Sequence, residues 1–324
     1  PDAAQELRRR ASMWCEQQGL MAEAIGYSLA AQDLDRALPL VERGAESAVM
    51  RSELATLQGW LEALPKELIR TRPLLCVYHT WALLLSGSTV DAAEARLQDA
   101  VDADVDGSIA GEVLALRALM ATYQRKMRES AELSRRALEL LPEDRLFFRS
   151  FIAGYLGYGA LYSGDLVAAR RGFEETVRLS ERAGNMVSAA LALTHLGDVS
   201  MMEGHVEAGK SYYEQALARA VDSQGQRQPI AGVALIGLGQ LLILDHRLDE
   251  AARYFDDGIE LIDRWGRAGA IGGYLGLARV RRAQGDMDAA HDALQTAERV
   301  AAEFEAMTED DAYVALEKAY LLLA

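Results

Sequence analysis

The sequence predicts an all-α fold, a right-handed superhelical solenoid of stacked helical hairpins. Two observations carry this prediction. The 324 residues include 55 alanines and 47 leucines, which are strong helix formers, and only 6 prolines. A short glycine-led motif also recurs about every 40 residues, a period typical of helical repeat arrays. The composition argues against an all-β chain, and the 50% of hydrophobic residues argues against disorder.

The recurring motif has the form Gly–polar–x–x–x–Ala. Five copies begin with glycine, at residues 19–24, 87–92, 164–169, 204–209 and 285–290. Three degenerate copies keep the register without the glycine, at residues 32–37, 126–131 and 246–251. From residue 87 onward the first positions fall at 87, 126, 164, 204, 246 and 285, so neighbouring copies are 38 to 42 residues apart. This spacing predicts one helical hairpin per copy, with the motif at its turn.

Each position of the motif has a physical role in such a turn. Glycine ends the first helix because it accepts the left-handed backbone conformation, and the polar residue beside it caps the second helix. The later copies also pair a small residue seven positions before the motif with a large residue nine positions after it. The small residues are Gly157, Gly197, Gly239 and Ala278, and the large ones are Phe173, Tyr213, Phe255 and Leu294. We expect each pair to interlock where two helices cross.

The repeat is irregular near the N-terminus. Residues 53–65 form an amphipathic helix that Pro65 ends, but the motif copies before it are unevenly spaced. We therefore expect an irregular helical N-terminal segment at residues 1–72 and a regular array at residues 73–324. The array looks truncated, because residues 312–324 have the pattern of a first helix without its turn. Since the first residue is Pro rather than Met, we expect a longer parent protein.

The hairpin pattern resembles tetratricopeptide repeats (TPR) of the longer type, and the chain more narrowly resembles the sensor region of MalT-like, LuxR-family regulators. Four consecutive blocks carry the narrower resemblance, at residues 10–25, 28–37, 53–65 and 72–87. The resemblance implies a cytoplasmic bacterial transcription regulator, a large signal-transduction ATPase. Its parent would carry an ATPase domain before this region and a DNA-binding domain after it. It also implies that an effector shifts the parent from a closed, ADP-held state to an open, self-associating one.

One motif suggests a nucleotide site, which we reject. Residues 204–211 match the phosphate-binding pattern GxxxxGK[ST], but that loop must follow a β-strand. The preceding residues 188–202 have helical periodicity instead, and Gly204 and Gly209 fall in register with the hairpin motif. Lys210 and Ser211 are therefore expected inside a second helix.

Other features argue against catalysis, metal binding and nucleic-acid binding by this region. Its five histidines include no pair at the spacing of a helical metal site, and Cys15 and Cys76 lie far apart, as expected for buried thiols in a reducing compartment. No nucleophile elbow or acid–base pair is visible. The net charge of −15 opposes a phosphate backbone, and no apolar stretch is long enough for a membrane span. We expect no enzyme activity and no cofactor.

The first helices of the hairpins should line a concave groove, and helical spacing selects the side chains that face it. Trp81 and Met120 lie on this stripe, together with the candidate ligand-binding residues. These candidates are Tyr123, Tyr158, Tyr162, Thr194, Asp198, Gln240, Arg279 and Arg282. Aromatic rings with a few convergent polar groups suit a polar small molecule such as a sugar. Two alternatives remain: Asp198 and Arg279 pair with each other, or the aromatic rings fill space between helices.

The resulting hypothesis is an effector-sensing and protein-interaction module that binds a small-molecule inducer in its groove. The alternative is a generic TPR scaffold whose groove holds a peptide or a partner protein. Glycine clusters at residues 154–159 and 272–276 leave a related question open. They provide either close approach between helices or room for a ligand against the backbone.

Overall fold

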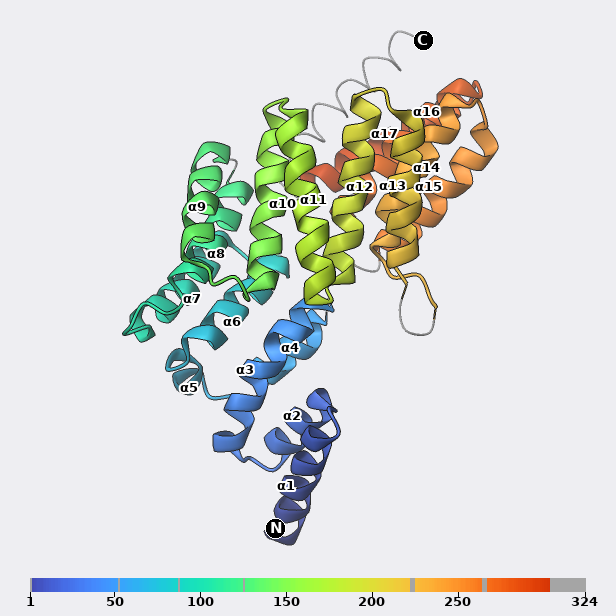
Figure 1. Cartoon of the computed structure of the whole chain (residues 1–324). Coiled ribbons are helices and arrows are strands. Elements are labelled where there is room, and N and C mark those ends of the chain that lie inside the picture. The colour runs from blue at the N-terminus through green and yellow to red at the C-terminus, as the bar shows by residue number, and fades with distance from the viewer. Residues whose placement is uncertain are drawn as a thin grey trace. The chain divides into compact units, whose positions relative to one another are not determined.

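The computed structural model describes residues 2–51, 53–86, 88–124, 126–221, 225–263 and 267–303. Within these ranges the chain consists of helices joined by short turns, and one isolated bridge between Val221 and Arg227 is their only β pairing. Figure 1 shows these helices in chain order, and the chain divides into two compact units. The N-terminal unit comprises Pro1–Thr122 and Lys126–Ile152, and the C-terminal unit comprises Tyr123–Arg125 and Ala153–Ala324. The all-α prediction is confirmed.

The N-terminal unit is built from nine helices and the start of a tenth among its described residues. They are α1 (Asp2–Gln17), α2 (Met21–Ala30), α3 (Leu34–Met50), α4 (Leu54–Glu62), α5 (Lys66–Arg70), α6 (Pro73–Leu85), α7 (Val90–Ala103), α8 (Ala110–Tyr123), α9 (Met127–Leu140) and α10 (Leu146–Tyr162). Pro65 precedes α5 and Pro73 opens α6, where a proline costs no hydrogen bond. The described residues of the segment 1–72 thus form helices joined by turns. The predicted boundary at residue 72, between an irregular segment and a regular array, stays a prediction.

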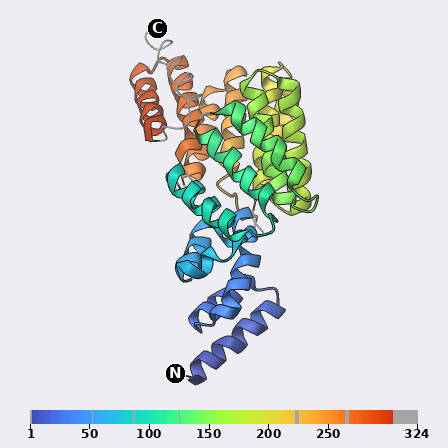
Figure 2. The same ribbon diagram turned by 90° about the vertical axis from the view of Figure 1, so that its left-hand side faces the viewer.

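Among its described residues, the C-terminal unit contains the remainder of α10, seven further α-helices and one 3₁₀ helix. The helices are α11 (Leu166–Ala183), α12 (Met186–Met202), α13 (Val206–Arg219), α14 (Ala231–Leu244), α15 (Leu248–Asp263), the 3₁₀ helix η1 (Arg267–Ala270), α16 (Ile271–Ala283) and α17 (Met287–Glu303). Neighbouring helices pack against one another, and Figure 2 shows α14 to α17 side by side in orange and red. The last predicted helix, at residues 312–324, lies outside the described residues.

The hairpin turns confirm the predicted motif at six of its eight copies. Gly19, Gly164, Gly204 and Gly285 all have φ between 75° and 81°, in the left-handed region. Gln32 and His246, which replace the glycine, adopt the same region with φ of 54° and 58°. Beside the glycines, Asp165 and Asp286 accept backbone N–H bonds as N-caps of the second helices. The turn therefore keeps the same backbone conformation where another residue replaces glycine.

At the copy beginning with Lys126, the predicted register is wrong by one residue. Lys126 has φ of −89° and is the N-cap of α9, the position that Asp165 holds in its own hairpin. The small buried residue of this hairpin is accordingly Ser130 rather than Ala131, and its hydroxyl donates to the carbonyl of Ala118. Without a glycine, nothing in the local pattern marked where the turn began.

The predicted interlock of small and large residues is confirmed, and it accounts for the glycines that lie at the helix crossings. A Cβ on Gly197 would lie 2.4 Å from the ring of Tyr213, and a Cβ on Gly239 would lie 2.7 Å from the ring of Phe255. The same rings reach the next hairpin, where Gly237 faces Tyr213 and Gly276 faces Phe255. Close helix approach is therefore the role of these positions. Gly159 is different, because nothing lies within 4 Å of a Cβ there.

In the N-terminal unit, aromatic rings form the core between α6 and α10. Trp81 is 1% exposed and contacts Phe147, Phe148 and Phe151, with a centroid distance of 4.1 Å to Phe151. Met120, which was expected on the same groove-facing stripe, is also buried. These two side chains fill space between helices and do not line a surface.

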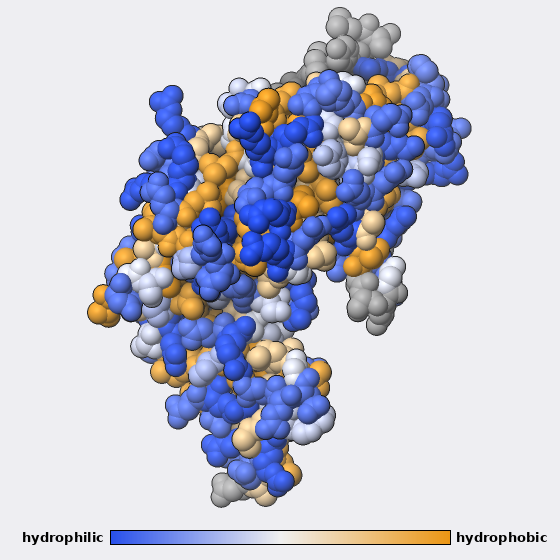
Figure 3. All heavy atoms as spheres, viewed as in Figure 1, coloured by the Kyte–Doolittle hydropathy of each residue, from blue (hydrophilic) through white to orange (hydrophobic). Residues whose placement is uncertain are grey.

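The visible surface is polar with apolar side chains dispersed in it, as Figure 3 shows. Among the described residues, no helix is sufficiently long and apolar to cross a membrane.

Candidate functional site

The candidate site lies in the C-terminal unit, on the first helices of successive hairpins. Helices α10, α12, α14 and α16 carry it, and α12 contacts α14 as α14 contacts α16. Each helix contributes a polar side chain six residues before the first residue of its turn motif, and these side chains are Tyr158, Asp198, Gln240 and Arg279. The second helices pack behind them, with Phe173, Tyr213 and Phe255 buried in the crossings.

A chain of hydrogen bonds joins α10, α12 and α13. The hydroxyl of Tyr158 contacts Nε2 of His195, and Nδ1 of His195 lies 3.2 Å from Oδ2 of Asp198. The other carboxylate oxygen of Asp198 accepts from the hydroxyl of Tyr213 at 2.7 Å. With Nδ1 donating to the carboxylate, Nε2 is the acceptor for the Tyr158 hydroxyl. The structure thus fixes both the imidazole and the carboxylate in orientation.

Burial and a neighbouring charge both affect the pKa of Tyr213, the phenol at the end of this series of hydrogen bonds. Tyr213 is 3% exposed, and burial together with the Asp198 carboxylate raises its pKa far above its usual range. Tyr213 therefore stays protonated and acts only as a donor. Tyr158 packs edge-on against the buried ring of Phe173, with centroids 5.5 Å apart.

The remaining predicted residues include a second hydrogen-bonded pair, Gln240 with Arg279. Arg279 of α16 donates to Oε1 of Gln240 of α14 at 3.2 Å, and Arg282 lies half-buried one turn further along α16. Tyr162 is 45% exposed at the end of α10, and its ring centroid is 6.4 Å from that of Tyr158. Tyr123 is half-buried at the end of α8, and burial raises its pKa to about 12.

Thr194 does not join the surface with the others. It is 2% exposed, and its hydroxyl donates to the carbonyl of Ala190 in its own helix. Among the predicted residues, the structure links Tyr158 to Asp198 by hydrogen bonds through His195, and it links Gln240 directly to Arg279. Asp198 and Arg279 have different partners, His195 with Tyr213 and Gln240 respectively, so the alternative in which they pair with each other is not what the structure shows.

Sequence reasoning missed the central residue of this site. His195 was one of five scattered histidines, but it lies three residues before Asp198 and thus on the same helix face. Tyr213 was expected only as a large packing residue, and its hydroxyl carries a second role. The i, i+3 relation of His195 to Asp198 was the available signal.

The site holds hydroxyl, imidazole, carboxylate, amide and guanidinium groups beside aromatic rings. Such groups can bind a polar molecule by hydrogen bonding and stacking. Within the described ranges, no group of three or more His, Cys, Asp or Glu side chains is placed to hold a metal ion. The segment before Gly204 is the helix α12, and Lys210 and Ser211 lie inside α13, so the match to the nucleotide motif has no nucleotide-binding context.

This fold defines a class, the tetratricopeptide-type repeat proteins with stacked helical hairpins. The family model described as the MalT-like TPR region matches residues 111–324, and the chain belongs to that family. A repeat region of this kind in a transcription regulator is a non-catalytic fold.

Curated relatives are similar to this chain over part of their length. The HTH-type transcriptional regulator MalT of Serratia proteamaculans is 26% identical over 286 residues, covering 86% of this chain and 32% of the relative. The MalT of Cronobacter sakazakii is 26% identical over 295 residues, covering 90% of this chain and 33% of the relative. The chain thus spans about a third of the length of the curated relatives that it matches.

Two solved structures share the fold at low sequence identity. A signal transduction ATPase with numerous domains and a tetratricopeptide repeat sensor, from Pyrococcus horikoshii, has a TM-score of 0.65 at 14% identity, covering 99% of this chain and 53% of that one. A Rap protein complexed with Competence and Sporulation Factor has a TM-score of 0.60 at 14% identity, covering 93% of this chain and 80% of that one.

Proposed function

We propose that this chain is the effector-sensing and protein-interaction module of a cytoplasmic bacterial transcriptional activator, and that a small-molecule inducer binds the face of α10, α12, α14 and α16. The observation that carries the proposal is the oriented chain Tyr158–His195–Asp198–Tyr213 beside the exposed ring of Tyr162. Asp198 keeps 42% of its side chain exposed, so a ligand hydroxyl can reach a carboxylate already fixed in place. The family to which the chain belongs supports the regulatory role.

The module would act on the rest of its parent protein. Its partners in this proposal are an ATPase domain and a DNA-binding domain of the same polypeptide, together with further copies of the activated parent. An effector can shift such an equilibrium only by the difference between its affinities for the two states. Binding at this face would therefore favour the arrangement in which the face is accessible.

The test is a thermal-shift screen of the 324-residue chain with neutral mono- and oligosaccharides and other polar metabolites, followed by titration calorimetry. A true effector raises the melting temperature by mass action on the folded state. We expect Asp198→Asn and Tyr162→Ala each to weaken binding by about tenfold. Tyr254→Ala, at an exposed ring on the second helix α15, is the matched control and should leave binding unchanged. Binding that survives both groove substitutions would contradict the proposed site.

A second candidate function is recognition of a peptide or a partner protein at the same face. It is favoured by the likeness to the Rap protein, which was solved with Competence and Sporulation Factor, and to the apo quorum sensor NprR from B. thuringiensis, whose TM-score is 0.56 at 11% identity. If no metabolite shifts the melting temperature and a peptide library yields a ligand sensitive to Asp198→Asn, this second function replaces the first.

A further inference from the structure

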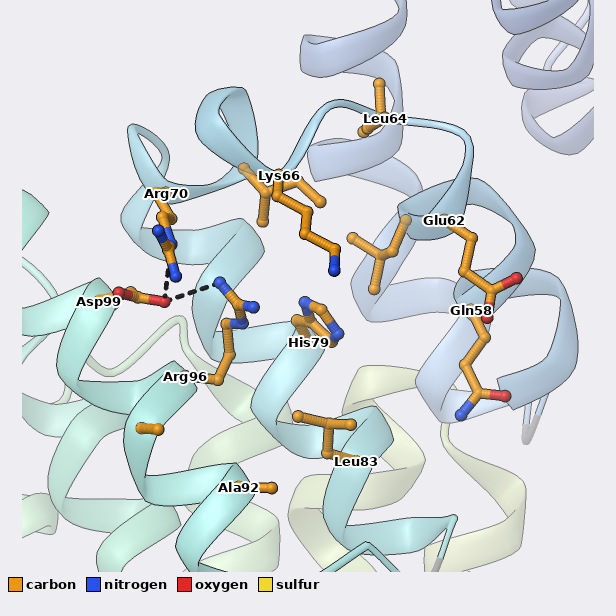
Figure 4. A pocket seen from close by; sticks show the side chains of 13 residues that line it. Gln58, Glu62, Leu64, Lys66, Arg70, His79, Leu83, Ala92, Arg96 and Asp99 are labelled. Carbon is orange, nitrogen blue, oxygen red and sulfur yellow. Dashed lines mark hydrogen bonds and ion pairs between the residues drawn. The ribbon is translucent and has the colours of Figure 1, made fainter.

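A cationic cavity lies in the N-terminal unit, apart from the residues of the proposed effector site. Its volume is about 570 Å³, within the usual range for small-molecule sites. Helices α4, α5, α6 and α7 line it, with an apolar wall that includes Leu61, Ile69 and Leu83. Figure 4 shows Lys66, His79 and Arg96 pointing toward one another across the cavity.

The charges around the cavity do not cancel. Arg96 and Arg70 share a single carboxylate oxygen of Asp99, at 2.7 Å and 3.3 Å. Lys66 makes no ion pair with any described residue, and the Glu62 side chain points away from the three nitrogen-bearing groups in Figure 4. A protein with a net charge of −15 thus concentrates basic groups at one concave position.

Two side chains that line the cavity each have a nitrogen atom with almost no accessible surface and no hydrogen-bond partner among the described residues. These atoms are Nδ1 of His79 and Nε of Arg96. Buried polar atoms are almost always paired in folded proteins, so each such atom calls for an explanation. Burial, with Arg96 and Lys66 adding to it, lowers the pKa of His79 to about 4. The imidazole is therefore neutral near pH 7, and an anion beside it would oppose that effect.

We propose that this cavity binds a small phosphorylated metabolite, with its phosphate held by Lys66, His79 and Arg96. Each of the three groups comes from a different helix, α5, α6 and α7, so three separate directions converge on one position. A phosphate monoester has three terminal oxygens to meet three donors, whereas a carboxylate has two. The body of the metabolite would lie against Leu61, Ile69 and Leu83. The site is independent of the face proposed for the inducer.

The experiment titrates the 324-residue chain with glucose 6-phosphate and with inorganic phosphate by calorimetry, and uses glucose and acetate as controls. We expect saturable binding of both phosphates and none of glucose or acetate. Lys66→Ala should weaken phosphate binding by about tenfold or more, because it removes one charged donor. Lys210→Ala removes another exposed lysine, from α13 inside the rejected nucleotide motif, and should leave phosphate binding unchanged.

Several outcomes would overturn the proposal. The phosphate site is contradicted if acetate binds with the same affinity as phosphate, if phosphate binds Lys66→Ala as tightly as the unsubstituted chain, or if no phosphate binding is detected. Loss of binding in Lys210→Ala would instead restore the nucleotide motif. A second measurement is independent of any charge-removing variant: the imidazole resonance of His79, identified by its loss in His79→Asn, should shift on addition of phosphate. These results are separable from the inducer proposal, because Asp198→Asn should leave phosphate binding intact.

Discussion

The imidazole of His79 lies in the wall of the cationic cavity, where burial and the neighbouring Arg96 and Lys66 disfavour its charged form. Its pKa falls from 6.5 to about 4. Between these values the unfolded chain carries a proton on this residue and the folded chain does not. The free energy of unfolding therefore falls as the pH falls from 6.5 toward 4.

We expect His79→Asn to remove about 1–3 kcal/mol of this pH dependence, because asparagine does not titrate. Denaturant unfolding of the unsubstituted chain and of His79→Asn, near pH 7 and near pH 4.5, measures this difference in the free energy of unfolding. The comparison must be made between the two proteins, since Glu16 and Asp104 have lowered pKa values and also cost stability in acid. Parallel loss of stability in both chains would show that His79 is not held neutral.

The hydroxyl of Tyr213 secures the carboxylate of Asp198 from behind the proposed inducer face. Tyr213→Phe leaves that carboxylate oxygen without its donor at 2.7 Å, so we expect a loss of about 1–2 kcal/mol in the free energy of unfolding. Tyr212→Phe removes a hydroxyl from the half-buried neighbouring residue and should change stability by less than about 0.5 kcal/mol. Equal effects of the two substitutions in urea unfolding would contradict a special role for the Tyr213–Asp198 bond.

At the scale of helices, the spacing between hairpins depends on glycine at the crossings. A Cβ on Gly276 would lie 2.4 Å from the ring of Phe255, whereas a Cβ on Gly159 would meet nothing within 4 Å. Both residues lie inside helices, α16 and α10, where alanine has the better intrinsic propensity. Substituting alanine at the two positions therefore distinguishes the effect of side-chain packing on stability from the effect of helix propensity.

We expect Gly276→Ala to destabilise the chain by about 1–3 kcal/mol, because the buried ring cannot move without shifting a helix. Gly159→Ala should instead stabilise it by about 0.5–1 kcal/mol. Thermal unfolding of the two variants gives the comparison. A stabilising Gly276→Ala would mean that the helices around Phe255 adjust freely, and the interlock would not set their spacing.

The hairpin elements were largely predictable from the sequence, because turn chemistry is local. Gly164 with Asp165 encodes both a left-handed residue and an N-cap, and the structure has both. Prediction was wrong by one residue at Lys126, where no glycine marks the turn. The C-terminal pattern at residues 312–324 stays a prediction.

At the scale of the whole chain, the acidic charge sets what the surface can bind. With 49 acidic and 34 basic residues, we expect no measurable binding of this chain to duplex DNA below about 0.1 mM at about 0.15 M salt. Fluorescence anisotropy with a labelled duplex measures this directly. Saturable binding that weakens steeply with salt would contradict the assignment of DNA contact to another part of the parent protein.

From the sequence, only the helix face that carries the candidate site was predictable, and not the contacts between its side chains. Tyr158, Asp198, Gln240 and Arg279 lie on α10, α12, α14 and α16, the first helices of successive hairpins, and their role as ligand-binding residues stays a prediction. Helical spacing also selected Trp81, which is buried among phenylalanines, and Thr194, which bonds to its own helix. A periodicity of 3.6 residues specifies the direction of a side chain to within a sector of the helix, and that sector includes both the surface and the crossing with the next helix.

The sequence alone determined the helices, the hairpin turns and the small-to-large interlock, since each depends on residues close together in the chain or on one repeated spacing. The tertiary structure decided which polar groups meet. Tyr158 and His195 are 37 residues apart, and Gln240 and Arg279 are 39 apart, so each contact joins neighbouring hairpins. The cavity around Lys66, His79 and Arg96 likewise needs three helices at once. Such contacts depend on how the helices cross and which rotamers fit, and neither is encoded in a local pattern.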